Sequence, residues 1–279
     1  MISDYISFCE NVKGFSPQTC RSYQSILRNF ARFFKKSNKR WSTITPDDVR
    51  EFIQATSKSA QASTVNVYIM TCRCFFDYLV RFKGLQSNPF AGFTKIKEPK
   101  RLVAGVPENV CQQCLNNPPA RSRRIKYLAW VAINIMYYEG LRISEVMNLR
   151  WSDVTEVIDV IGKGNKERIV PVAKELATLL NHERCIDDKS TYIMESYGER
   201  VRLRSLTFEI NKLLLEAGCE VALAHPHALR HTFATRLACH GIPLPVLQKL
   251  LGHNNLSTTE IYLSVTREEI IQNFNRYSI

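Results

Sequence analysis

The chain has 279 residues, of which 45% are hydrophobic and 23% charged, and its net charge at pH 7 is +12. These proportions are typical of a folded protein with a substantial core and exclude a disordered chain. No apolar run approaches the roughly 20 residues that cross a bilayer, which excludes a membrane-spanning protein. The N-terminal residues lack the basic-then-apolar layout of a secretory signal, so we expect a cytoplasmic protein.

The positive charge is concentrated at the N-terminal end. Residues 1–104 hold 17 Lys and Arg against 7 Asp and Glu, whereas residues 105–279 hold 21 against 19. A basic N-terminal part suits a polyanionic partner, and nucleic acid is the commonest polyanion in the cytoplasm. The alternative is that the charge only keeps the protein in solution.

Four helices are expected in the first 93 residues. Ser16 and Pro17 form an N-cap and first-turn signal, and apolar residues then recur at three- and four-residue spacing through residues 16–34. Thr45-Pro46 repeats the signal, with two acids in the first turn that follows. Another apolar pattern covers residues 63–82, and a short helix over residues 1–12 completes a small helical domain, residues 1–93.

A basic linker is expected over residues 94–104. This stretch is charged, contains a proline and lacks apolar periodicity, which is typical of a linker. Its four basic residues could touch a DNA backbone, although a solvated linker explains them equally well. They are Lys95, Lys97, Lys100 and Arg101.

Residues 105–279 are expected to form a second, mostly helical domain. Helices are predicted over 125–139, 143–150, 176–180, 203–216, 229–239, 245–251 and 258–264. Two β-branched runs within residues 154–172 flank Gly162-Lys163-Gly164-Asn165-Lys166, which predicts a hairpin. The fold class is therefore mainly α with a small antiparallel β-sheet, in two domains.

Several polar residues of the second domain could act together on a phosphate. Arg142 follows the break of a buried helix at Gly140, and Lys163 lies in the hairpin turn between two glycines. His227 and Arg230 are three residues apart, so a helix places them on one face. His253 and Tyr262 follow. Arginine suits bidentate phosphate binding, so the set fits phosphoryl transfer without a metal, although each residue alone is ordinary.

The ordered motifs resemble those of a known family. GLRISE at 140–145, GKGNK at 162–166, HALRH at 227–231, LGH at 251–253 and Tyr262 together resemble the tyrosine site-specific recombinases of the phage integrase family, with compact Xer-like members the most similar. The resemblance covers essentially the whole chain. It implies an N-terminal SAM-like, core-binding domain (1–93) and a catalytic domain (105–279, with α+β fold) that together clamp DNA.

The resemblance also implies a mechanism. Tyr262 would attack a scissile phosphate, release a 5′-hydroxyl and leave a 3′-phosphotyrosyl bond. Arg142 and Arg230 would hold the non-bridging oxygens. Lys163 would be the general acid for the departing 5′-oxygen, and Lys166 is the alternative because it shares the hairpin. A tyrosine with its ordinary pKa near 10 needs such nearby cations or a base to react at neutral pH.

The histidines divide into two groups in this interpretation. His227 would assist transfer of the tyrosine proton, and His253 would hydrogen-bond the phosphate or orient the site. We expect His225 and His231 to be structural or to support the residues that contact the phosphate, and Glu145 to be a structural partner of Arg142 or of a helix end.

The implied partners are double-stranded DNA with specific core sites and further copies of the chain, as dimers or tetramers on DNA that exchange strands through a Holliday junction. A C-terminal tail helix over about 266–279 carries an apolar stripe and would dock on a neighbouring copy, although it could instead pack on its own domain. No metal, ATP or other cofactor is implied, and no membrane. The involvement of accessory host proteins stays open.

Two other functions compete with this one. A type IB-like topoisomerase would use the same chemistry to relax DNA without pairing two sites, and a DNA-binding regulator would have lost catalysis. The biological role, whether integration and excision, inversion or dimer resolution, is not readable from the sequence.

Nine cysteines cannot pair completely, and we expect them to be reduced and structural. A zinc or redox role for Cys72 and Cys74 (CxC) or Cys111 and Cys114 (CxxC) is the alternative.

Overall fold

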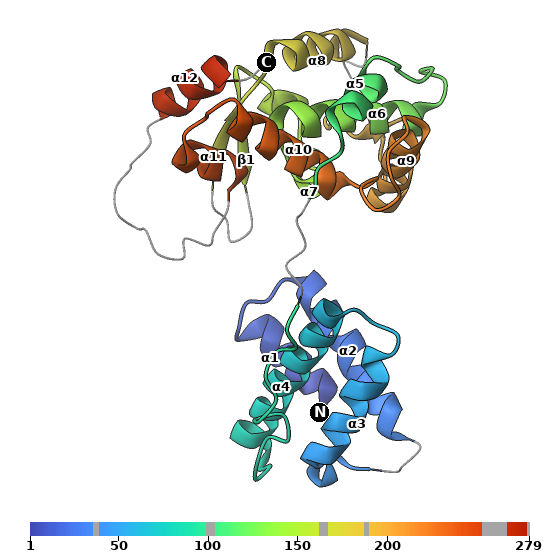
Figure 1. The fold of residues 1–279 in the computed structure, drawn as a ribbon, viewed down its shortest axis with the longest axis vertical. Coiled ribbons are helices and arrows are strands. Elements are labelled where there is room, and N and C mark those ends of the chain that lie inside the picture. The colour runs from blue at the N-terminus through green and yellow to red at the C-terminus, as the bar shows by residue number, and fades with distance from the viewer. Residues whose placement is uncertain (36–38, 99–103, 162–166, 187–189, 253–266, 278–279) are drawn as a thin grey trace. The chain divides into compact units, whose positions relative to one another are not determined.

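The computed structural model describes residues 1–35, 39–98, 104–161, 167–186, 190–252 and 267–277 (Figure 1). The chain divides into two compact units, Met1–Arg101 and Leu102–Ile279. The division falls inside the stretch predicted to be a linker. In the described part of the chain, no helix is both long and apolar enough to cross a membrane.

The N-terminal unit contains the four predicted helices. They are α1 (Ile2–Asn11), α2 (Pro17–Lys35), α3 (Pro46–Ser57) and α4 (Ala62–Lys83), with a short 3-10 helix at Trp41–Thr43. Aromatic side chains fill the space between them. Phe30 is fully buried and its ring lies 4.7 Å from that of Phe52 and 5.6 Å from that of Phe90, measured between centroids. Edge-to-face and tilted contacts of this kind add to the free energy of burial.

The predicted start of α3 is a reciprocal cap. The amide of Asp48 donates to Thr45 Oγ1 over 3.3 Å, and the amide of Thr45 donates to Asp48 Oδ2 over 2.9 Å. These bonds satisfy donors that a helix N-terminus leaves free. An ion pair from Lys39 lowers the pKa of Asp48, assisted by Thr45.

The first residues of the predicted linker are hydrogen-bonded to α4. The buried side chain of Asn66 donates to the carbonyl of Ile96 over 3.0 Å and accepts from its amide over 2.7 Å. Lys95 and Lys97, on either side of Ile96, are exposed. Lys100 and Arg101 lie outside the described residues.

The second unit is mostly helical and carries two short hairpins, which confirms the predicted fold class. Its helix α6 runs through the middle, and all but a few of its residues are buried between α9 and α10 (Figure 1). The elements are α5 (Glu108–Leu115), α6 (Arg124–Glu139), α7 (Ile143–Val146), a 3-10 helix (Trp151–Asp153), β1 (Val157–Ile161), β2 (Glu167–Pro171), α8 (Lys174–Ile186), β3 (Glu195–Ser196), β4 (Glu199–Arg200), α9 (Leu203–Glu216), α10 (Pro226–Cys239), α11 (Leu244–Leu251) and α12 (Arg267–Tyr277).

The predicted hairpin is formed by β1 and β2, which pair antiparallel from Val157 opposite Pro171 to Ile161 opposite Glu167. Its turn, residues 162–166, with Lys163 and Lys166, lies outside the described residues. The second hairpin, β3–β4, was missed. Its turn residues Tyr197 and Gly198 both have positive φ, 54° and 77°, as tight hairpin turns require.

Several predicted helices have different lengths in the structure, among them the helix predicted over 229–239, which begins at Pro226. The helix predicted over 143–150 ends at Val146, because the chain turns toward the 3-10 helix and Arg150 bridges to Tyr192. The helix predicted over 176–180 extends over Lys174–Ile186. The helix predicted over 258–264 lies outside the described residues.

Helix α12 packs on its own domain, against β2 and α11. Phe274 is fully buried, and its ring centroid lies 6.5 Å from that of Phe233 on α10. The tail therefore has a binding place within the single chain.

All nine cysteines are free thiols, and burial raises the pKa of Cys111 to about 12 and of Cys114 to about 11.

Candidate active site

Arg142 is placed by a sharp end to helix α6. Gly140 has φ 62°, and a Cβ there would lie 2.7 Å from Cε1 and 2.8 Å from Cγ of the Phe233 ring. Only glycine allows both the left-handed backbone and this close approach. The chain then turns through buried Leu141 and places Arg142 at the N-cap of α7.

Glu145 binds two arginines at once. Its carboxylate accepts from the backbone amide of Arg142 over 2.7 Å and from Arg142 Nη1 over 2.8 Å. Arg168 of strand β2 donates through Nη1 over 2.9 Å and through Nη2 over 2.8 Å. Arg230 Nη1 lies 3.9 Å from the same carboxylate. We call Glu145, Arg142, Arg168 and Arg230 the Glu145 cluster.

The cluster holds Glu145 ionised. Burial by itself raises the pKa of this carboxyl, but the hydrogen bonds from Arg168 and Arg142 outweigh burial and lower the pKa to about 2. With three guanidinium groups and one carboxylate, the Glu145 cluster carries a net charge of +2 at neutral pH. This excess of positive charge suits an anionic ligand.

Arg230 is a buried member of the cluster, and its ion pair with Glu145 is longer than those of Arg142 and Arg168. It is 8% exposed, and it donates through Nη1 to the carbonyl of Gly140 over 2.6 Å and through Nη2 to the carbonyl of Leu251. Burial lowers its pKa to about 10, and the positive charges of Arg142 and Arg168 act in the same direction. Arg230 therefore stays charged at neutral pH.

The C-terminal end of α11 is hydrogen-bonded to the arginines of the same cluster. Three successive carbonyls each accept from a different arginine: Leu250 from Arg168 Nε over 2.8 Å, Leu251 from Arg230, and Gly252 from Arg142 Nη2 over 3.1 Å. The last carbonyls of a helix have no partner within the helix and carry its partial negative charge, so cations stabilise them.

Helix α10 carries His227 one turn before Arg230, as predicted, and His227 is exposed. His225 is the N-cap of this helix, because its Nδ1 accepts from the amide of Ala228 over 3.1 Å. That is the structural role expected of His225. Burial lowers the pKa of His231, and His227 and Arg230 act in the same direction.

The structure thus brings Arg142 and Arg230 together and places His227 on the helix of Arg230. His253 and Tyr262 lie outside the described residues, as do Lys163 and Lys166.

Arg168 was missed by the sequence reasoning, although a signal for it existed. Residues two apart in a strand share a face, so Arg168 shares the face of fully buried Val170 and lies opposite Val160 in the hairpin. An arginine at such a position needs a buried partner. Glu145 is that partner.

Glu139, the last residue of α6, is a second buried carboxyl beside the site. Its Oε1 accepts from the amide of Ala173 over 2.8 Å, and its Oε2 has no partner among the described residues. Complete burial raises its pKa to about 8, and Glu175 adds to the rise, while Ala173 and Arg236 oppose it. Glu139 is therefore mainly protonated in the folded protein at neutral pH.

We expect Glu139 to make the folded state less stable as pH rises from about 5 to 8. The unfolded chain loses this proton near 4.5, whereas the folded chain keeps it to about pH 8. Over this interval the folded state binds more protons, so the free energy of unfolding falls with pH. Urea unfolding between pH 5 and 8.5 measures the slope.

Glu139→Gln is the matched variant, because the amide oxygen still accepts from Ala173 but carries no titrating proton. It should flatten the fall in stability between pH 5 and 8. An unchanged slope in this variant would show that another group is responsible.

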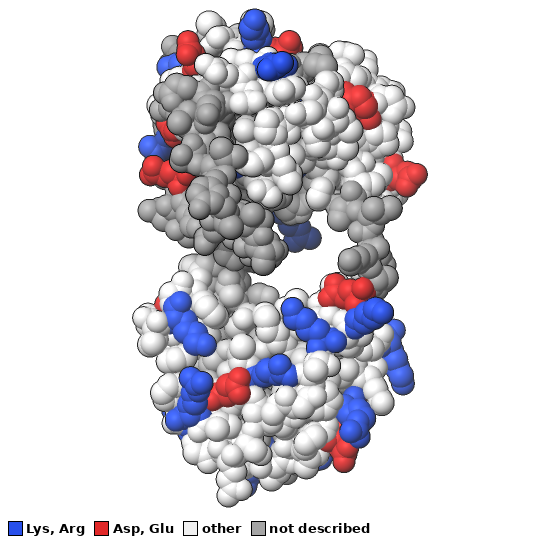
Figure 2. Space-filling view, turned by 60° about the vertical axis from the view of Figure 1, so that its left-hand side comes forward, with Lys and Arg blue, Asp and Glu red and all other residues white. Residues whose placement is uncertain are grey.

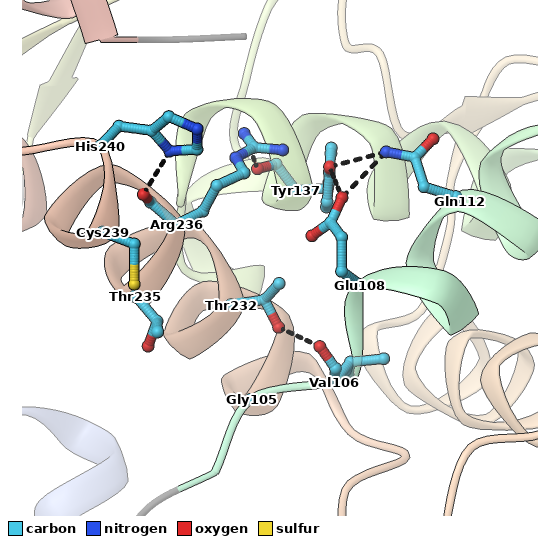
Figure 3. A pocket seen from close by; sticks show the side chains of 10 residues that line it. All are labelled: Gly105, Val106, Glu108, Gln112, Tyr137, Thr232, Thr235, Arg236, Cys239 and His240. Carbon is cyan, nitrogen blue, oxygen red and sulfur yellow. Dashed lines mark hydrogen bonds between the residues drawn. The ribbon is translucent and has the colours of Figure 1, made fainter.

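A cavity of about 490 Å³ lies on another side of α10, between α5 and α6 (Figure 3). There Tyr137 Oη and Gln112 both bond Glu108, and the Arg236 guanidinium lies 3.9 Å from the Tyr137 ring centroid. None of the predicted site residues that the structure describes lines this cavity. The Glu145 cluster, with its converging charges, is the better candidate for the active site.

Solved structures with the same fold are recombinases. XerH site-specific recombinase bound to palindromic difH substrate matches with a TM-score of 0.73, covering 100% of this chain and 82% of its own, at 19% identity. A lambda integrase dimer bound to a COC′ core site matches with a TM-score of 0.72, covering 92% of this chain and 74% of its own, at 16% identity. These matches show that the chain has the fold of site-specific recombinases and integrases.

Sequence comparison gives the family. The chain is 31% identical to a tyrosine recombinase of Thermosipho africanus (strain TCF52B), over 96% of this chain and 95% of that protein, and 32% identical to tyrosine recombinase XerD of Proteus mirabilis, over 92% and 86%. The model of the phage integrase family matches residues 106–269, and that of the phage integrase N-terminal SAM-like domain matches residues 2–83. The chain belongs to the phage integrase family and is a site-specific recombinase that cleaves and rejoins DNA.

Proposed function

We propose that Arg142 and Arg230 of the Glu145 cluster bind the scissile phosphate of double-stranded DNA and that Tyr262 attacks it. The observation that carries the proposal is the convergence of Arg142 and Arg230, from α7 and α10, on one carboxylate and on the end of α11. Guanidinium groups bind phosphate oxygens through paired N–H donors. Two fixed guanidinium groups beside a phosphate stabilise the negative charge that develops as the phenol oxygen attacks.

The remaining roles follow the family pattern. The Tyr262 oxygen forms a bond to phosphorus as the bond to the 5′-oxygen breaks, which leaves a 3′-phosphotyrosyl link. Lys163 gives its proton to the 5′-oxygen, with Lys166 as the alternative. His227 takes part in transfer of the tyrosine proton, and His253 contacts the phosphate. The covalent link conserves the energy of the phosphodiester bond, so the strand can be rejoined to a new 5′-hydroxyl without ATP or another cofactor.

The N-terminal unit would also bind the DNA. Over the face of this unit that Figure 2 shows, Lys and Arg side chains are widespread and Asp and Glu side chains are fewer. The basic composition of residues 1–104 and the exposure of Lys95 and Lys97 support contacts with the phosphate backbone. Lys100 and Arg101 belong to the same proposal. A DNA substrate also agrees with the expected cytoplasmic location.

We further propose that dimers and tetramers assemble on specific core sites and exchange strands through a Holliday junction. The lambda integrase structures that share the fold include a dimer on a core site and a tetramer on a Holliday junction. In the single chain α12 packs on its own domain, so docking of the tail on a neighbouring copy would require release of Phe274 from its place beside Phe233. A type IB-like topoisomerase would need no such assembly.

Trapping the covalent intermediate tests the proposed chemistry. A nicked suicide duplex that carries a core site loses the short strand after attack, so the protein remains attached to the DNA. The wild-type chain should give a denaturant-stable adduct. Tyr262→Phe removes the nucleophile and should reduce the adduct below detection while DNA binding is kept.

Tyr277→Phe is the matched control, because it deletes the other hydroxyl near the C-terminus and keeps the ring. It should leave the adduct in place. An adduct that survives Tyr262→Phe, or none with the wild type, would refute the mechanism.

A further inference from the structure

We propose that Arg168 is a positioning residue of the DNA-cleavage site. It does not touch the substrate in this proposal. It acts through Glu145 and through the end of α11, and so holds the phosphate-binding arginines in place. The inference rests on the proposed function of the Glu145 cluster and goes beyond it, because Arg168 is outside the set of residues that would contact the phosphate or transfer protons.

All three guanidinium nitrogens of Arg168 donate to protein groups. Nη1 and Nη2 donate to the two oxygens of Glu145 over 2.9 and 2.8 Å, and Nε donates to the carbonyl of Leu250 over 2.8 Å. Its side chain is 9% exposed and that of Glu145 is 7% exposed. The charge of Arg168 is already balanced by a carboxylate that it bonds through both Nη atoms, whereas the Nη atoms of Arg230 bond neutral carbonyls, so Arg168 has less charge to offer to DNA. Its role is therefore to fix its partners.

The first partner, Glu145, sets the position of Arg142. The carboxylate that accepts hydrogen bonds from Arg168 also accepts hydrogen bonds from the backbone amide and Nη1 of Arg142. Without Arg168, the charge of Glu145 would be balanced mainly by Arg142, and less of the positive charge of Arg142 would remain for a phosphate. Because Arg168 neutralises Glu145 from the protein side, Arg142 and Arg230 supply a net positive charge to the site.

The second partner is the end of α11. The Cδ of Arg168 lies 3.0 Å from where a Cβ of Gly252 would be, so the arginine stem lies directly against this left-handed glycine. Leu250, which accepts from Nε, is three residues before His253. Arg168 is itself five residues after Lys163 in the β1–β2 hairpin. One side chain therefore joins the hairpin, the helix of Arg142 and the segment that leads to His253.

Lysine cannot replace this arrangement. Its ammonium keeps the charge but is a point donor, whereas the guanidinium bonds two carboxylate oxygens and a carbonyl in one plane. We expect Arg168→Lys and Arg168→Gln both to slow cleavage by about 10–100-fold, by analogy with the loss of a group that orients a metal ligand. The exposed Arg184 on α8 supplies the matched control, and Arg184→Gln should cleave like the wild type.

The test is single-turnover cleavage of the suicide duplex at saturating protein, with DNA affinity and the urea midpoint measured for each variant. A second duplex carries a neutral methylphosphonate at the scissile position, where phosphate charge no longer has to be balanced. The defect of Arg168→Gln should shrink on this duplex, because the arginines it misplaces are needed less. If Arg168 only stabilised the fold, Arg168→Gln would slow cleavage of both duplexes by the same factor, and that result would overturn the proposal.

A double-mutant cycle tests the route through Glu145. If Arg168 acts through that carboxylate, Glu145→Gln combined with Arg168→Gln should be less harmful than the product of the two single effects. Additive effects, wild-type cleavage by Arg168→Gln, or full activity of Arg168→Lys would each contradict the proposal. If the wild-type chain forms an adduct that Tyr262→Phe abolishes while Arg168→Gln cleaves normally, this inference fails and the proposed function stands.

Discussion

Replacing Arg230 with alanine should lower the rate constant of DNA cleavage by about 10²–10³-fold, the cost of removing one preorganised donor to the transition state. Arg230 is held by the carbonyls of Gly140 and Leu251, so its position is fixed before DNA binds. Its burial makes the electrostatic effect larger than that of an exposed arginine, since water does not screen it. Single-turnover cleavage at saturating protein measures the effect.

Arg230→Ala also removes the donor that the carbonyls of Gly140 and Leu251 share, which costs stability as well as rate. Arg230→Lys separates the two effects, because it keeps the charge and loses the paired geometry; it should recover part of the rate. The urea midpoint must be measured for both variants, and the assay run where both are folded. If Arg230→Ala cleaves within about threefold of the wild type under those conditions, Arg230 does not stabilise the transition state of cleavage as proposed.

Most helices and the β1–β2 hairpin could be predicted because local signals specify them, whereas α5 was not predicted. The Thr45-Pro46 start, the glycine that ends α6 and the β-branched runs of the β1–β2 hairpin each act within a few residues. The β3–β4 hairpin was missed because each strand has only two residues, too few for an alternating pattern. The length of α7 could not be predicted from the sequence either, since it depends on the bridge between Arg150 and Tyr192, which are far apart in the chain.

The same distinction holds for the site. Arg142, His227 and Arg230 lie in recognisable motifs, and the helical spacing of the last two was sufficient to place them on one face. The charge balance of the Glu145 cluster was not predictable, because it depends on Arg168 approaching from the hairpin and on three carbonyls at the end of α11. These contacts join segments up to 110 residues apart, so they exist only once the domain has folded.

The close packing at Gly140 leads to the largest expected effect on stability. Gly140→Ala should lower the free energy of unfolding of the catalytic unit by about 2–5 kcal/mol, measured by urea unfolding. Alanine is strained at φ 62°, and its Cβ would overlap the Phe233 ring, which is fully buried and cannot move aside freely. Both penalties fall on the turn between α6 and Arg142.

Gly218→Ala is the matched control for this prediction. Gly218 belongs to the same unit and also has positive φ, 88°, but a Cβ there would meet nothing within 4 Å. It should therefore show the backbone strain alone, about 1–2 kcal/mol. If the two variants lose equal free energy of unfolding, the Phe233 ring must move aside to accommodate the added methyl group. If the contact with Phe233 is as tight as the structure has it, Gly140→Ala should also displace the carbonyl that holds Arg230, and cleavage should fall even at temperatures where the variant is folded.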